Sequence, residues 1–155
     1  MKIGIIVFSK TGNTYSVADK LKEKLSNSGH SVKVEKLNPI GDVYPGIKSI
    51  EFESIPDIKE YELVIFGSPV WAFSLSPALK FYMKKLSSLE DKKIICFVTM
   101  GLPFTWMGGN NAVYQMIKIC KSNGIIPLTT SVIKWNKKRD EEIDNFINNI
   151  MQVLK

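Results

Sequence analysis

The sequence predicts an α/β fold, in which a doubly wound, five-stranded, mostly parallel sheet carries helices on both faces. Two observations support this class. Short apolar runs alternate with segments of helical periodicity along the whole chain, and two of the apolar runs have features typical of sheet edges. We expect strands at residues 2–8, 31–37, 62–67, 92–99 and 125–133, and helices at 13–28, 76–87, 110–123 and 139–154.

The strands differ in how much water we expect them to contact. The first, third and fourth are almost continuously apolar, which is typical of parallel strands buried on both faces. The second alternates apolar with polar residues, and Pro127 in the fifth cannot donate to a neighbouring strand. Placing these two at the edges predicts the strand order 2-1-3-4-5, because the alternative order 3-2-1-4-5 would expose the apolar third strand.

The helices are predicted from apolar residues that recur three and four positions apart. Ser28-Gly29 and Asn123-Gly124 end the first and third helices. Residues 38–61 have three prolines, two glycines and little periodicity, so they predict a long connection with at most one helical turn near 56–61. A shortened helix is favoured there over a functional loop.

Composition predicts a single domain at residues 1–155, located in the cytoplasm. The chain is 45% apolar and 23% charged, begins without a signal-peptide pattern and has no apolar run that could span a bilayer. Cys96 and Cys120 lie in apolar surroundings and form no metal-binding pattern, so we expect reduced core thiols. The net charge of +6 comes from dispersed lysines. It favours an anionic ligand or an acidic partner over nucleic acid.

The first unusual loop lies between the first strand and the first helix. It consists of Ser9, Lys10, Thr11, Gly12, Asn13 and Thr14. Backbone N–H groups and the positive end of a helix dipole would face this loop, so it predicts a site for a phosphate group. Helix capping by Asn13 or Thr11 is the alternative, but capping requires only one such residue. The loop lacks the Walker and dinucleotide glycine patterns, an acidic pair for Mg²⁺ and a nucleophilic cysteine.

Two further loops should leave the same end of the sheet. Residues 67–77 and 99–111 contain no charged residue, and they carry aromatic side chains that we do not expect to be buried by packing alone. We expect them to face each other beyond the phosphate loop and to hold a flat ring system attached to the phosphate. Ordinary loop packing is the alternative for each aromatic residue taken singly.

These residues resemble the flavodoxins. Residues 9–14 match their [ST]-x-T-G-x-T phosphate loop, residues 61–82 are similar to their Y-D-x-x-x-x-G-x-P-x-W segment, and residues 97–101 look like the start of their third flavin loop. The resemblance implies noncovalent FMN, with its phosphate in the first loop and its ring between the other two. The residues so implied beyond the first loop are Ser68, Pro69, Val70, Trp71, Ala72, Phe73, Thr99, Met100, Gly101, Gly108 and Gly109.

The chain departs from ordinary flavodoxins in charge, because they are acidic and this chain is basic. Without carboxylates near the flavin, and with Lys10 in the phosphate loop, we expect its reduction potential to be less negative than theirs. The resemblance implies an electron carrier between redox partner proteins, as a monomer or homodimer, and the positive charge favours acidic partners. An FMN-dependent NAD(P)H oxidoreductase of the quinone or flavin reductase type is the alternative, and a sensor that binds FMN only for structure is a third. The sole histidine, His30, is expected far from the site.

Overall fold

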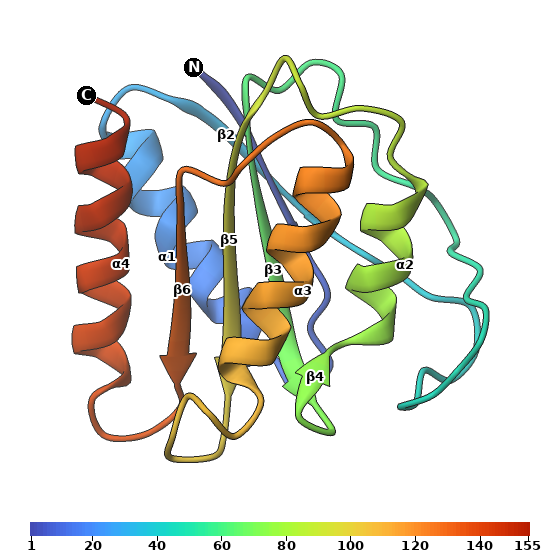
Figure 1. Ribbon diagram of the computed structural model, residues 1–155. Coiled ribbons are helices and arrows are strands. Elements are labelled where there is room, and N and C mark those ends of the chain that lie inside the picture. The colour runs from blue at the N-terminus through green and yellow to red at the C-terminus, as the bar shows by residue number, and fades with distance from the viewer.

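The computed structural model describes residues 1–155, which form one sheet flanked by four helices (Figure 1). The strands are β1 (Lys2–Val7), β2 (Ser31–Lys36), β3 (Leu63–Trp71), β4 (Ser74–Leu75), β5 (Lys93–Met100) and β6 (Thr129–Lys134). The helices are α1 (Asn13–Asn27), α2 (Pro77–Lys85), α3 (Gly109–Ser122) and α4 (Arg139–Val153).

The strand order is β2-β1-β3-β5-β6, and all of these neighbours pair in parallel. This confirms the predicted order 2-1-3-4-5 with the two expected edges. The predicted strand count is one too low, because the two-residue β4 pairs antiparallel with β3 and gives a six-stranded sheet. The third strand does not end at Gly67 as predicted: it continues to Trp71 and then turns back.

The sheet separates two apolar layers. Helices α1 and α4 cover one face and α2 and α3 the other, as Figure 1 shows. Each helix contributes apolar side chains to these layers, such as Leu21 in α1 and Phe146 in α4, both essentially inaccessible to water. Within α3, Ile119 is buried and Ile117 is only half-buried.

The last strand begins later than predicted. β6 starts at Thr129, so Pro127 lies before the strand and removes no hydrogen bond from the sheet. The strand is still at an edge, because it pairs only with β5. The edge prediction is therefore right for this strand, but the reason given for it is wrong.

Residues 58–61 form one hydrogen-bonded turn, in which the Tyr61 amide donates to the Ile58 carbonyl at 3.1 Å, in line with the single turn allowed from the sequence, but the connection 38–61 contains no helix. It is instead an irregular segment packed beside α2. An isolated antiparallel bridge joins Pro39 to Phe52, whose ring meets the edge of Tyr82 at a centroid distance of 6.5 Å. The Tyr82 hydroxyl donates to the Pro56 carbonyl at 2.8 Å. These contacts fix the connection to α2.

Candidate functional site

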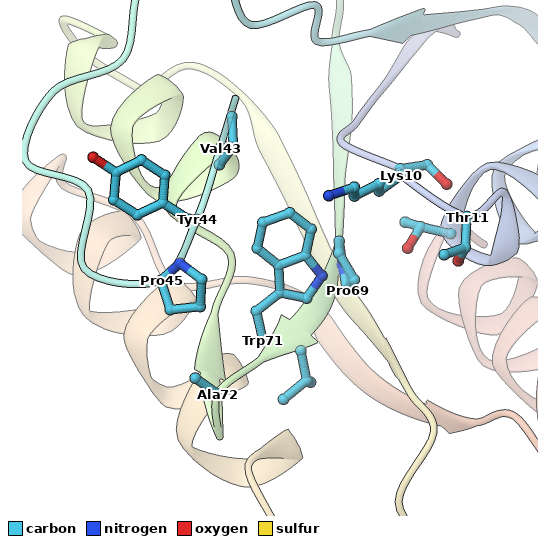
Figure 2. A pocket seen from close by; sticks show the side chains of 11 residues that line it. Lys10, Thr11, Val43, Tyr44, Pro45, Pro69, Trp71 and Ala72 are labelled. Atoms are coloured by element: carbon cyan, nitrogen blue, oxygen red, sulfur yellow. The ribbon is translucent and has the colours of Figure 1, made fainter. Parts of the chain in front are cut away.

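A cavity of about 490 Å³ lies at the carboxyl end of the sheet, where Figure 2 shows its lining side chains. Three segments supply the walls. They are Ser9, Lys10, Thr11 and Thr14 after β1, Pro69, Val70, Trp71 and Ala72 at the end of β3, and Val43, Tyr44 and Pro45 from the connection. The position beyond the strand ends agrees with the general rule for open parallel sheets.

The loop after β1 is an array of free hydrogen-bond donors. Gly12 is the N-cap of α1 with φ +96°, and no side chain caps the helix, so the alternative of capping by Asn13 or Thr11 is wrong. None of the backbone N–H groups of residues 10–14 donates to an acceptor in the protein. Free amides at a helix N-terminus with no acidic residue in the first turn are suited to an anion.

Two hydroxyl groups of this loop are already oriented. Ser9 Oγ accepts a hydrogen bond from the Tyr15 amide at 3.2 Å, which leaves the Ser9 proton free to donate. Thr14 is buried, and its Oγ1 lies 2.8 Å from Oγ1 of Thr99 at the end of β5. If Thr99 is the donor, the Thr14 proton can also point to an anion. Thr99 thus contacts the site through Thr14, although it does not line the cavity.

The Trp71 indole lies among the lining side chains, between Lys10 and Tyr44 (Figure 2). The edge of Phe8 meets its ring at 5.3 Å with an interplanar angle of 83°. Lys10 Nζ lies 5.6 Å from the centroid of the same indole, within cation–π range, and belongs to no ion pair. The lysine of the phosphate loop therefore reaches across the cavity to the aromatic wall.

The turn after Trp71 has an uncommon backbone conformation. Ala72 and Phe73 have φ values of +49° and +61°, which side-chain-bearing residues rarely adopt. The start of α3 holds this turn: Asn111 Nδ2 donates to the Phe73 carbonyl at 3.1 Å, and a Cβ on Gly108 would lie 2.6 Å from the Phe73 Cα. Strained turns of this kind persist where the surrounding structure fixes them.

The remaining predicted site residues occupy other places. Ser68 is buried, and its hydroxyl pairs with that of Ser76 at 2.7 Å. Met100 is buried, Gly101 has open space around it, and a Cβ on Gly109 would meet Val132 and Met100. Neither these residues nor Gly12, Asn13, Phe73, Thr99 and Gly108 line the cavity. A flavin contact for them stays a prediction.

The third loop holds two exposed aromatic side chains, of which Trp106 is the most exposed aromatic residue near the site. Phe104 and Trp106 are 56% and 73% exposed. Their rings stack on each other at a centroid distance of 6.0 Å and an interplanar angle of 6°, and neither lines the cavity. These two side chains therefore lie outside the cavity, and the expected contact of the third loop with a flavin stays a prediction.

Sequence reasoning missed the third wall, Val43-Tyr44-Pro45. The available signal was an aromatic residue beside Pro45 and Gly46 in a connection longer than a compact domain needs. Periodicity gives no information on where such a segment lies, so the shortened-helix interpretation was favoured instead.

The structure offers no cluster of histidine, cysteine, aspartate and glutamate that could bind a metal ion. None of its helices is both long and apolar enough to cross a membrane. His30 lies next to the Met1 amino group at 3.2 Å and lines no wall of the cavity, as expected. Lys10 and Tyr44 are the titratable side chains that do line it.

A protein-family model described as a flavodoxin domain matches residues 4–105, a segment that includes all three walls. The chain belongs to the flavodoxin family. This confirms the resemblance drawn from the phosphate loop and the segment at 61–82. No curated protein sequence matches the chain.

Solved flavodoxin structures share the fold at low sequence identity. Oxidised flavodoxin 2 from Bacillus cereus is 18% identical with a TM-score of 0.71, covering 98% of this chain and 99% of that one. Two-electron-reduced flavodoxin from Megasphaera elsdenii is 15% identical with a TM-score of 0.71, covering 97% and 98%. A flavoprotein from Lactobacillus acidophilus, solved in complex with FMN, is 15% identical with a TM-score of 0.65, covering 93% and 97%.

Proposed function

We propose that this flavodoxin-family protein binds FMN noncovalently and carries electrons between redox partner proteins. The observation that carries the proposal is the free donor array at residues 10–14, which opens into a cavity bounded by Trp71. A phosphate monoester with a flat ring fits this combination of anion site and aromatic wall. The FMN bound to the Lactobacillus acidophilus relative of the same fold gives further support.

Different residues of the cavity would bind the phosphate and the ring of FMN. The amides of residues 10–14 and the hydroxyls of Ser9 and Thr14 would hold the phosphate, and Lys10 would add a positive charge. Trp71 would support the ring. When bound, FMN supplies the redox chemistry, so the chain itself contributes binding, orientation and electrostatics.

The composition of the cavity favours a carrier over an NAD(P)H oxidoreductase. No carboxylate, histidine or cysteine lines its walls, so no side chain is placed to accept a proton from a substrate. The net charge of +6, together with a third loop that has no charged residue, favours acidic partner proteins. The buried free thiols Cys96 and Cys120 support a reducing cytoplasmic location. Both a monomer and a homodimer are compatible with this role.

The cofactor assignment is tested by titrating the apoprotein with FMN and with riboflavin, which lacks the phosphate. Because each charge-assisted hydrogen bond contributes about 1.5–3 kcal/mol, FMN should bind at least about tenfold more tightly. Replacing Thr11 and Thr14 by alanine should reduce this preference, while Thr105→Ala in the third loop serves as a control. Equal affinity for the two flavins in the unmodified protein would contradict the phosphate site.

The electron-carrier role is tested on the FMN-loaded protein under anaerobic conditions. Reduction should proceed in two separate one-electron steps, followed by absorbance, and NADPH should be oxidised no faster than by free FMN. Rapid NADPH oxidation in the presence of a quinone would instead support the oxidoreductase alternative.

A further inference from the structure

A second cavity, of about 340 Å³, adjoins the first one and shares Pro45, Trp71 and Ala72 with it. Its other walls come from the connection, from β4 and from the exposed side of α2. Nothing in the proposed electron-carrier function uses this space. Its volume is within the range of small-molecule sites.

Two lysine residues belong to the lining of this cavity. Lys80 and Lys84 both line it from α2, and residues four apart project from the same face of a helix. Neither lysine belongs to an ion pair. No carboxylate lines the cavity, so its lining contains two lysines and no negative charge.

A hydroxyl donor lies in the same cavity. Ser74 in β4 lines it, and Ser74 Oγ accepts a hydrogen bond from Gln115 Nε2 at 2.7 Å. The Ser74 proton is not used in any hydrogen bond of the protein, so it is free to donate to a ligand.

The rest of the lining is apolar. Ile47, Trp71, Leu75 and Phe81 contribute large side chains from three different segments. An apolar cavity with a few polar groups in its lining is suited to an amphipathic molecule, whose apolar part contacts the large side chains and whose anionic group contacts the donors.

We propose that this second cavity binds a small aromatic monoanion, such as an aryl carboxylate, separately from FMN. The ring lies among Trp71, Leu75 and Phe81, and the anionic group is held by Lys80, Lys84 and Ser74. Trp71 lies between this ligand and the cofactor cavity, so the ligand binds one side chain away from the redox centre.

The proposal is tested with 1-naphthoate and its neutral analogue 1-naphthamide, which have almost the same shape and differ in charge. Each is titrated calorimetrically into the FMN-saturated protein, in which the first cavity is filled. We expect one binding site for naphthoate and at least tenfold weaker binding of naphthamide. Equal binding of the two probes, or no binding of either, would overturn the proposal.

The lysine pair is tested with the double variant Lys80→Gln and Lys84→Gln. Naphthoate affinity should fall at least tenfold, to that of naphthamide, while FMN affinity and the melting temperature stay unchanged. The control is the double variant Lys118→Gln and Lys121→Gln, which removes the same charge from α3 and should keep the naphthoate affinity. Equal losses in both variants would show a general charge effect and contradict a site.

Competition separates this proposal from the assignment of FMN to the first cavity. Naphthoate that excludes FMN completely, so that the two are never bound together at any concentration, would occupy the flavin cavity, and the second site would be ruled out. If the protein fails to bind FMN at all, the same probes and variants are applied to the apoprotein, and dependence of naphthoate binding on Lys80 and Lys84 still supports the second site. The two proposals therefore fail on different measurements.

Discussion

The starts of α1 and α3 have the same local geometry and different surroundings. Each helix begins after a glycine of positive φ, +96° at Gly12 and +116° at Gly108, and neither has a side-chain cap. A Cβ on Gly12 would meet nothing within 4 Å, whereas one on Gly108 would collide with Phe73 and Val70. The start of α1 faces open space, whereas the start of α3 is packed against the turn at Phe73.

The two helix starts also differ in how many of their backbone N–H groups already donate to an acceptor in the protein. The amides of residues 10–14 have no acceptor in the protein, whereas around the start of α3 the Met107 and Asn110 amides donate to the carbonyls of Phe104 and Thr105 at 3.0 and 2.9 Å. A glycine N-cap is therefore not sufficient for an anion site. An anion site also requires that the backbone N–H groups around the glycine have no acceptor within the protein.

The largest expected effect comes from exchanging the two glycines for alanine. Gly108→Ala combines backbone strain with overpacking against the Phe73 backbone, so it should lower the free energy of unfolding by about 2–4 kcal/mol. Gly12→Ala adds only backbone strain, which should lower the free energy of unfolding by about 1–2 kcal/mol. Urea denaturation measures both. Equal losses would contradict the distinction between a packed and an open helix start.

The bond between Thr14 and Thr99 links the first loop to β5, and Thr99→Val tests it. The Thr14 hydroxyl then loses its buried partner, which should cost about 1–3 kcal/mol of stability and reduce affinity for FMN more than for riboflavin. Replacing both threonines by valine should restore much of the stability, because no polar group is left unpaired, but not the FMN affinity. Restored FMN affinity in the double variant would contradict the role of Thr14 at the phosphate.

Lys10 distinguishes the first loop from the neutral third loop by charge. Lys10→Gln should make the flavin reduction potential more negative, because a positive charge near the ring favours the anionic reduced form. A two- to tenfold loss of that preference corresponds to roughly 20–60 mV for a one-electron step. Potentiometric titration measures the shift. Lys22→Gln, on the exposed face of α1, is the control and should leave the potential unchanged.

The smallest expected effect is at the turn that Gly108 supports. Ala72→Gly should relieve the strain of a positive φ at the cost of extra chain entropy, for a net gain of about 0.5–1 kcal/mol. Thermal unfolding measures it. A loss of stability would show that the Ala72 methyl group contributes packing that outweighs the strain.

The strand order and the first loop were predictable, because both depend on local signals. Continuous apolar runs mark the central strands, and the hydroxyl-rich loop at 9–14 follows one of them directly. The β4 hairpin was not predictable, since its turn is Ala72-Phe73 and not the Asn-Gly type that marks such turns. The packing of Gly108 against the Phe73 backbone was not predictable either, because a sequence shows the glycine but not its neighbour in space.

Trp71 forms a wall of both cavities, and this has a thermodynamic consequence. Occupancy of one cavity that shifts the indole changes the free energy of binding in the other. Linkage then requires reciprocity: the factor by which FMN alters the affinity for a second-site anion equals the factor by which that anion alters the affinity for FMN. The level of a small metabolite could in this way set how firmly the protein retains its cofactor.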